Sequence, residues 1–360
     1  MKQKRLAVAV LVLMLAACGK PTPVESPAGA APLTQGPASR SLTPPPPPAI
    51  EAGKPVEVVA HPDPLSVLAN DNPVLAANKR LAFDMWRTVL NAGHQEEAAH
   101  FIAENYIQHS PFQRSGRAAM MQTFSVIPRR DEIPEVMRPT PVTFIAEGDL
   151  VALVAIDSLP EPDGSGKKYT TTHFNLFRVI DGKLGEHWHP DRSPPCPELP
   201  GAADGGPVPV SGVSGDAQLP LLQAATPAMA ANKKLVFDMW RELMDAGLED
   251  KVDDYLAADY IEHDPSLATG RDAAKARFAM QPDLPVEPTL RAPVVAMMAE
   301  GDVVILVTRI DLPDPYRAGQ HYSTVNIDMF RIADGRIAEH WDGAMKPGTN
   351  EVEMGSTCKK

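Results

Sequence analysis

One carboxylate in an otherwise apolar stretch is the side chain of this 360-residue chain whose surroundings most favour chemistry. Asp328 lies within residues 325–332, whose apolar and β-branched side chains predict a strand. Side chains alternate across a strand, so Asp328 shares one face with Asn326, Phe330 and Ile332. Burial of that face would disfavour a charged carboxylate and raise its pKa, which makes Asp328 a candidate general acid or base.

Two further polar side chains could complete such a site. Tyr260 and His263 lie in the sequence Tyr-Ile-Glu-His-Asp-Pro at 260–265. A carboxylate can remove a proton next to a carbonyl while a His or Tyr donates a hydrogen bond to the enolate oxygen. This chemistry requires no cofactor and no metal, and we expect neither. Two alternatives stay open: Asp328 as a structural carboxylate, and His263 as a histidine that caps the turn beside it.

The pattern around Asp328 occurs a second time, 153 residues earlier in the chain. Asn175 stands at the position of Asp328, and His189 at that of Asp342. The first expected helix is repeated as well, because nine of eleven residues are identical between 77–87 and 231–241. The chain is therefore a tandem repeat whose copies differ at positions that carry chemistry.

Each copy has the same expected elements. A helix opens at Asn72-Pro73 and at Thr226-Pro227, where a capping residue precedes a proline. Second helices are expected at about 94–103 and 248–257, and third helices open at Gly116-Arg117 and Gly270-Arg271. Strands follow at about 134–146, 149–158, 168–180 and 183–190, and at 286–299, 302–312, 321–333 and 336–345. Helices followed by strands predict an α+β fold.

Several motifs resemble those of SnoaL-like proteins, which are polyketide-cyclase relatives with the NTF2-like fold. They are Asn-Lys-Lys-Leu-Val-Phe-Asp at 232–238, Ala-Glu-Gly-Asp at 299–302, the 260–265 motif and the run 328–342. The resemblance implies two tandem cone domains, each with three helices packed on a curved antiparallel sheet. We refer to residues 71–192 as domain 1 and to residues 226–346 as domain 2.

The resemblance also implies site residues. The family's acid/base falls on Asp328, with His263 and Tyr260 beside it. The implied pocket residues are Trp240, Phe330, Asn326 and His340 in domain 2, and His109, Tyr106 and Asn175 in domain 1. Because Asn175 replaces the acid, catalysis by domain 1 is in doubt. The alternative is that Trp86 and Trp240 pack in the core, and that His187 and His340 have structural roles in packing and hydrogen bonding.

The implied function is acid/base catalysis on a small carbonyl compound in domain 2: aldol-type cyclisation, isomerisation or dehydration. The alternative is a non-catalytic protein that binds a small apolar ligand or a partner, since this fold hosts both. NTF2-like domains commonly pair through the outer sheet face, where Ile327 and Met329 are expected. We therefore expect the two domains to form an internal pseudo-dimer.

Residues 1–18 predict a targeting signal, with Lys2, Lys4 and Arg5 before an apolar stretch too short to span a bilayer. Leu-Ala-Ala-Cys at 15–18 resembles a bacterial lipobox, which implies lipidation of Cys18. An ordinary secretory signal is the alternative. In lipoproteins of Gram-negative bacteria, an Asp directly after the lipidated cysteine favours retention in the inner membrane. This chain has Gly19 there, so the resemblance implies the outer membrane, facing the periplasm. Residues 19–70 are rich in proline and predict an extended tether.

The remaining segments are a linker, 193–225, and a polar tail, 347–360. They contain Cys196 and Cys358, which could form a disulfide or remain two unpaired thiols. His187 and His189, with His173 or His109, have a spacing that imitates a metal site, but no metal is expected. The formal net charge of −12 argues against nucleic acid as a partner.

Overall fold

The computed structural model describes residues 41–46, 50–51, 53–191 and 199–349. These belong to one compact unit that begins at Ser41. The predicted signal, Cys18, Cys196 and Cys358 lie outside the described residues. Within the described ranges, none of the helices combines the length and the apolar character that a membrane crossing requires.

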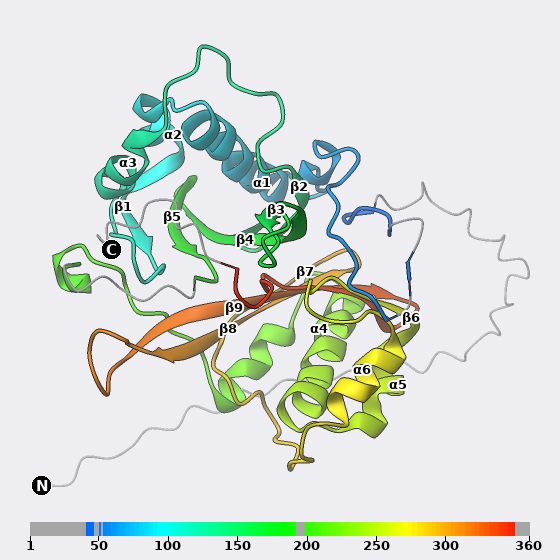
Figure 1. Cartoon of the computed structure of the whole chain (residues 1–360). Coiled ribbons are helices and arrows are strands. Elements are labelled where there is room, and N and C mark those ends of the chain that lie inside the picture. The colour runs from blue at the N-terminus through cyan, green and yellow to red at the C-terminus, as the bar shows by residue number, and fades with distance from the viewer. Residues whose placement is uncertain (1–40, 47–49, 52, 192–198, 350–360) are drawn as a thin grey trace, which may run out of the picture. The chain divides into compact units, whose positions relative to one another are not determined.

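The two copies fold alike, with helices packed on a five-stranded sheet (Figure 1). Domain 1 contains α1 Pro73–Met85, α2 Ala98–Phe101, β1 Ile102–Gln108, α3 Arg117–Thr123, β2 Pro141–Glu147, β3 Leu150–Pro160, β4 Lys168–Ile180 and β5 Lys183–Trp188. Domain 2 contains α4 Pro227–Met239, α5 Val252–Tyr255, β6 Leu256–Glu262, α6 Arg271–Phe278, β7 Val294–Glu300, β8 Val303–Pro313, β9 His321–Ala333 and β10 Arg336–Trp341. The predicted α+β architecture with two tandem domains is confirmed.

The first helix of each domain begins where the sequence predicts. The Asn72 side chain accepts a hydrogen bond from Val74 N, and Thr226 accepts one from Met229 N. A proline follows each cap at the first helical position, where its missing N–H costs nothing. Both helices continue as a π-helical segment, Trp86–Asn91 in domain 1 and Trp240–Asp245 in domain 2.

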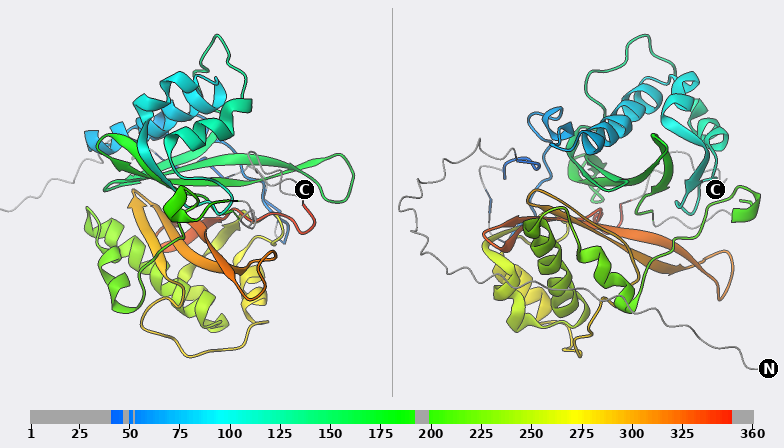
Figure 2. Two further views of the ribbon diagram at one scale, coloured as in Figure 1. Left: turned by 90° about the vertical axis from the view of Figure 1, so that its left-hand side faces the viewer. Right: turned by 180° about the vertical axis from the view of Figure 1, so that it is seen from behind.

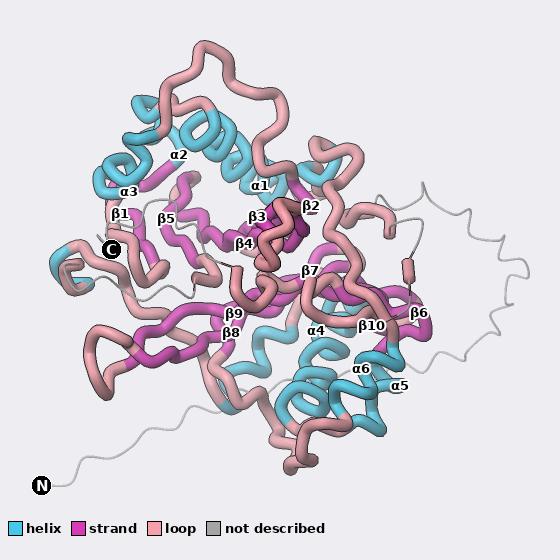
Figure 3. The backbone as a smooth tube through the Cα atoms, viewed as in Figure 1, coloured by secondary structure: helices cyan, strands magenta, loops and turns pink. Residues whose placement is uncertain are grey.

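The first strand of each domain was not predicted. The second helices end at Phe101 and Tyr255, and the chain then enters β1 and β6 directly. These strands pair in parallel with β5 and β10, which makes the sheet orders β1-β5-β4-β3-β2 and β6-β10-β9-β8-β7 (Figure 3). Tyr106 and Tyr260 therefore lie on strands. The partner of each strand lies about 80 residues further along the chain, so local sequence patterns do not reveal the pairing.

The stretches 134–140 and 286–293 were expected to belong to strands but lie outside them, because β2 begins at Pro141 and β7 at Val294.

The expected tether, residues 19–70, is also wrong in part. Val56 and Val58 are buried, and residues 53–61 form a strap that contacts both domains. Thr269 N of domain 2 donates to Lys54 O at 3.1 Å, and His61 N donates to Pro141 O of domain 1 at 2.9 Å.

A second strap, residues 207–213, lies in the expected linker and makes the reciprocal contacts. Val208 N donates to Gln108 O of domain 1, and Val213 N donates to Val294 O of domain 2, both at 2.8 Å. Each strap thus leads into one domain while it contacts the other. The valines of both straps supply apolar side chains and β-propensity that a purely flexible linker lacks.

The outer faces of the two sheets share one apolar cluster, while the helices pack against the inner faces (Figure 2). Ile327 and Met329 belong to this shared cluster, as expected for paired domains, together with Phe174, Trp188 and Trp341. Strands β2 and β7 lie next to each other at this junction.

Two buried ion pairs join the domains in a reciprocal arrangement. Lys79 on α1 pairs with Glu300 at the end of β7, and Lys233 on α4 pairs with Glu147 at the end of β2, at 2.7 Å. The lysine side chains are 0% and 3% exposed. Glu300 also accepts a hydrogen bond from Ala146 N, and Glu147 accepts one from Ala299 N. The glutamates belong to the Ala-Glu-Gly-Asp motifs, whose role at this junction the sequence did not reveal.

Candidate functional site

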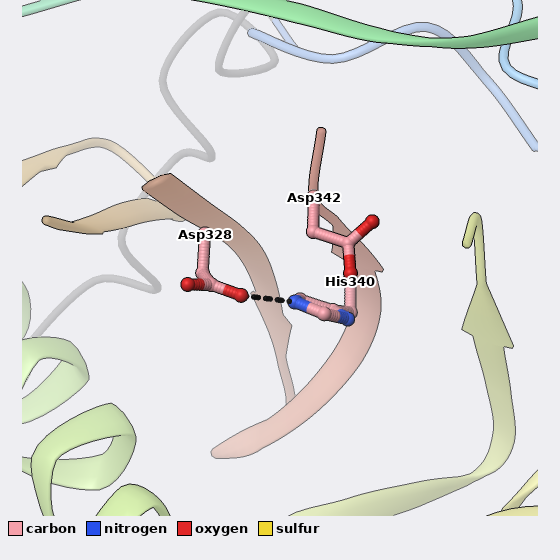
Figure 4. Close-up of side chains that lie close together, drawn as sticks. All are labelled: Asp328, His340 and Asp342. Atoms are coloured by element: carbon pink, nitrogen blue, oxygen red, sulfur yellow. Dashed lines mark hydrogen bonds and ion pairs between the residues drawn. The ribbon is translucent and has the colours of Figure 1, made fainter. Parts of the chain in front are cut away.

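A continuous chain of hydrogen-bonded side chains lies on the inner face of the domain 2 sheet. Tyr260 donates to Glu262 Oε2 at 2.9 Å, Glu262 Oε1 lies 2.8 Å from His340 Nδ1, and His340 Nε2 lies 3.1 Å from Asp328 Oδ1. We call these four residues the polar chain of domain 2. Figure 4 shows its outer end, where Asp328 and His340 meet beside Asp342.

Strand register brings these residues together. Tyr260 and Glu262 lie two apart on β6, so they share a face. Glu262 lies beside His340 of β10 in the parallel pair, and His340 lies opposite Phe330 of β9 in the antiparallel pair. The Phe330 ring stacks on the His340 ring with centroids 4.7 Å apart. This packing fixes the imidazole so that one nitrogen faces each carboxylate.

The polar chain holds His340 in its charged form. Burial acts to lower the pKa of His340, but the charge of Glu262 and the hydrogen bonds to Asp328 and Glu262 outweigh it and raise the pKa well above its usual value. Burial likewise acts to raise the pKa of Glu262, yet the His340 charge and its hydrogen bond lower that pKa to about 2. Arg277 of α6 lies 3.3 Å from Glu262 and adds a second positive charge.

Asp342 is the carboxyl group of this site that is hardest to ionise. Burial raises its pKa to about 7, helped by the negative charges of Glu262, Asp264 and Asp328, although His340 acts in the opposite direction. Its Oδ1 accepts a hydrogen bond from Ala344 N at 3.1 Å. A pKa near 7 allows the group to change protonation state at neutral pH.

Asp328, His340 and Asp342 each place one donor atom within 4.8 Å of the others, a spacing that a metal ion could bridge. An imidazole that donates from both nitrogens has no lone pair to offer a metal, so the charged state of His340 favours acid/base chemistry here. The outer end of the chain reaches solvent. Asp328 is 7% exposed and His340 and Asp342 are half-buried, whereas Glu262 is 1% exposed.

Asp328 has one oxygen that remains available. Oδ1 faces His340, and among the described residues Oδ2 has no hydrogen-bond partner. In Figure 4, this second oxygen points away from the imidazole. The site therefore presents a carboxyl oxygen without a partner beside a second carboxyl group whose pKa is raised.

Domain 1 has neutral groups at the matching positions, which we call the polar chain of domain 1, but the Tyr106 hydroxyl has no hydrogen-bond partner among the described residues. Tyr106, Gln108, His187 and Asn175 occupy the four positions, and His189 replaces Asp342. His187 Nδ1 lies 3.1 Å from Gln108 Oε1, and His187 Nε2 lies 2.9 Å from the Asn175 amide. Burial lowers the pKa of His187 well below its usual value, with further repulsion from His189, His109 and His173.

The structure places most of the predicted site residues together. Asp328, Tyr260 and His340 lie in the polar chain, Phe330 stacks on His340, and half-buried Asn326 shares their strand face. Trp240 is buried in the core of domain 2 between helices and sheet. Tyr106 and Asn175 lie in the domain 1 chain, where the Tyr106 ring stacks on His187 at 6.3 Å.

The assignments of His263 and His109 to the pockets are wrong. His263 stacks on Trp341 at 4.7 Å, and His109 stacks on Trp188 at 4.8 Å, on the outer faces of the sheets. His109 also lies 2.8 Å from Glu186 Oε1. The reason is the unpredicted strand. His263 follows directly after β6 and its N–H donates to His340 O, so the strand's alternation continues and turns its side chain to the face opposite inward-facing Tyr260.

Glu262, Arg277 and Asp342 are the residues that the sequence did not assign to the acid/base site. A signal was present for two of them, because Glu262 and Asp342 are replaced by Gln108 and His189 in the other copy, as Asp328 is by Asn175. Arg277 gave no such signal. Two surface hollows of about 580 and 480 Å³ lie in domain 1, and neither includes a member of its polar chain.

Family comparisons agree with this architecture. Residues 80–194 match the SnoaL-like polyketide cyclase model, and residues 237–340 match the SnoaL-like domain model. A search of curated proteins finds no match to this chain.

Similar solved structures each cover about a third of the chain. TsrD from Streptomyces laurentii is 20% identical over 36% of this chain and 90% of its own, with a TM-score of 0.22. An LEH-like epoxide hydrolase from M. tuberculosis is 20% identical over 32% and 80%, with a TM-score of 0.24. IdmH from Streptomyces antibioticus is 22% identical over 31% and 89%, with a TM-score of 0.22. The chain belongs to the SnoaL-like family of NTF2-like α+β proteins and contains two such domains in tandem.

Proposed function

We propose that domain 2 is a cofactor-independent acid/base site that enolises a small carbonyl compound. The observation that carries the proposal is the pair of carboxyl groups in different surroundings beside one imidazolium. Asp328 accepts from charged His340, and Asp342 has its pKa raised to about 7 by burial. Carboxyl groups whose environments separate their protonation behaviour can divide the roles of base and acid.

In this mechanism, Asp328 Oδ2 removes a proton from the carbon next to the carbonyl group. Protonated Asp342 donates its hydrogen to the carbonyl oxygen, so an enol forms and the two carboxyl groups exchange protonation states. His340 remains charged throughout, because Glu262 and Asp328 both accept from it. One side-chain atom each of Asp328, His340 and Asp342 lie within 4.8 Å of one another, a separation that suits contacts with two adjacent atoms of one small substrate. Enolisation is the first step of an aldol-type condensation, an isomerisation or a dehydration.

The protein would act at the bacterial cell envelope. The pattern of residues 1–18 supports a lipid anchor on Cys18, and Gly19 supports an outer-membrane location facing the periplasm. The substrate would then be a small carbonyl compound present in that compartment.

The test follows exchange of the protons next to the carbonyl of 2-tetralone, in D₂O, by proton NMR with the full chain. We expect the wild-type protein to accelerate exchange and Asp328→Asn to lower the rate to the uncatalysed level, since the amide cannot accept the proton. Asp311→Asn is the matched control. Asp311 lies on β8 opposite Ser323 of β9, five residues along that strand from Asp328, and its exposed pair with Arg309 contributes little to stability. Full exchange by Asp328→Asn would instead support the binding-protein alternative.

A further inference from the structure

In domain 1 a neutral histidine, His187, lies between two amides, Gln108 and Asn175. The hydrogen bonds of Gln108 determine which atom of the buried Asn175 amide faces His187. Gln108 Oε1 accepts a hydrogen bond from Ser110 N at 2.9 Å, and Gln108 Nε2 donates to Gln113 Oε1 at 2.8 Å. The orientation of Gln108 is thus set by a backbone donor. Its Oε1 can only accept, so His187 Nδ1, 3.1 Å away, must carry a hydrogen.

The second nitrogen of His187 then acts as an acceptor. A neutral imidazole has one N–H, and in His187 this is on Nδ1, which leaves the Nε2 lone pair facing the Asn175 amide at 2.9 Å. The hydrogen-bond network assigns amide oxygen and nitrogen, because the two atoms are alike in size. The Asn175 amide must therefore present its NH₂ group to His187 and turn its oxygen away.

That turned-away atom has no partner. Asn175 is 3% exposed, and the amide atom that does not face His187 is buried without a hydrogen bond among the described residues. An unpaired buried acceptor is costly, and native proteins rarely leave one unless a ligand or water completes it. In domain 2 the matching atom is Asp328 Oδ2, to which we assigned the contact with substrate.

Rings surround the open end of this chain. The Trp86 ring of the first helix packs edge-on against His173 at 5.9 Å, and His173 lies 4.8 Å from His189. All three side chains are half-buried, and the His189 ring lies 6.4 Å from the His187 ring that contacts Asn175. Burial, together with the charge of His189, lowers the pKa of His173 to about 3, so the His173 ring is uncharged at neutral pH. Asp191 pairs with His189 at 3.0 Å.

From these contacts we infer that domain 1 is a second, non-catalytic site that binds an uncharged, flat molecule through an O–H or N–H donated to the Asn175 amide oxygen. An anion is disfavoured here, because the Asn175 amide oxygen is an acceptor and needs a donor. The inference uses domain 1 residues alone, so it stands or falls separately from the function proposed for domain 2.

The test measures binding of three naphthalene probes to the full chain by isothermal titration calorimetry at neutral pH. The probes are 2-naphthol, which donates a hydrogen bond; 2-methoxynaphthalene, which has the same ring without a donor; and 2-naphthoate, which is an anion. We expect 2-naphthol to bind at least about ten-fold more tightly than either of the others, because only it pairs the buried acceptor. NMR should show the Asn175 side-chain amide and the His187 ring shifting on binding.

Two variants locate the binding. Asn175→Ala should reduce 2-naphthol affinity to that of the methoxy probe. Asn175→Asp is the isosteric variant, and domain 2 has an aspartate, Asp328, at the matching position. This variant should convert His187 to its charged form and change the affinity for 2-naphthol. Equal affinity for the three probes, absence of binding by any of them, or unchanged affinity in both variants would each overturn the inference.

Discussion

His340 Nε2 lies 3.1 Å from the Asp328 carboxylate, and at the same place in the other domain His187 Nε2 lies 2.9 Å from the Asn175 amide. The geometry is conserved between the two halves of one chain, while the carboxylate on each side of the ring is replaced by an amide. As a result, the pKa of one histidine is raised and that of the other is lowered. The two domains are therefore internal controls for each other.

The first prediction concerns the pH dependence of exchange catalysed by domain 2. Asp342 acts as an acid, so it must be protonated, and activity should be lost as pH rises through about 7. Asp342→Asn should lower the rate by about ten- to a hundred-fold and abolish the alkaline decline, because an amide donates a hydrogen bond but does not titrate. A rate that increases through pH 7 in the wild-type protein would show that Asp342 is not the acid. Addition of a chelator should leave the rate unchanged.

The second prediction concerns the ion pairs between the domains. Lys79→Met should lower the free energy of unfolding by about 3–5 kcal/mol, because Glu300 would remain buried without its counter-charge. Lys233→Met should act in the same direction through Glu147. The matched control is Lys54→Met, whose pair with Glu51 is exposed and should contribute less than about 1 kcal/mol. Denaturant unfolding followed by circular dichroism measures all three.

Solution scattering adds a second readout for the same junction. The shared apolar cluster and the reciprocal ion pairs predict a monomeric chain in which the two domains tumble together. Lys79→Met should loosen this arrangement and increase the radius of gyration. Independent motion of the domains in the wild-type protein would contradict the pairing.

The third prediction concerns acid stability. The pKa of His173 is lowered to about 3 by burial and by the charge of His189, so the folded state resists a proton that the unfolded state accepts. Stability from this group is fully present above pH 6.5 and falls as pH decreases toward 3, by at most about 1.4 kcal/mol per pH unit. His173→Asn introduces the residue that domain 2 has at the matching position, Asn326. This variant should make the midpoint of thermal denaturation less dependent on pH over this range. An unchanged slope would exclude His173 as the cause.

The fourth prediction concerns the membrane anchor. Cys18→Ser should release the protein from the membrane fraction, because the variant cannot be lipidated. Cys196→Ser is the control and should leave fractionation unchanged. Membrane association that survives Cys18→Ser would contradict the lipoprotein assignment.

Sequence patterns predicted the fold class and half of the site, but not the first strand of each sheet. The repeated helix caps, the strand around Asp328 and the apolar residues Ile327 and Met329 follow from local alternation, and the structure has them as expected. His340 and Asp328 also share a site because their strands are neighbours in a hairpin.

The remaining site residues depend on a pairing between distant parts of the chain. Glu262 reaches His340 only because β6 lies in parallel beside β10, some 78 residues away in sequence. The same strand turns His263 to the outer face. Arg277 reaches Glu262 from a helix, and nothing in its own surroundings indicates that contact.

The most direct test of the account is a proton and nitrogen NMR titration of the histidine rings in the full chain. We predict that His340 carries hydrogens on both nitrogens well above pH 6.5, and that His187 remains neutral with its hydrogen on Nδ1 well below that pH. Glu262→Gln combined with Asp328→Asn should convert His340 to the behaviour of His187. If His340 and His187 titrate alike in the wild-type protein, the proposed division between a charged catalytic domain and a neutral binding domain is wrong.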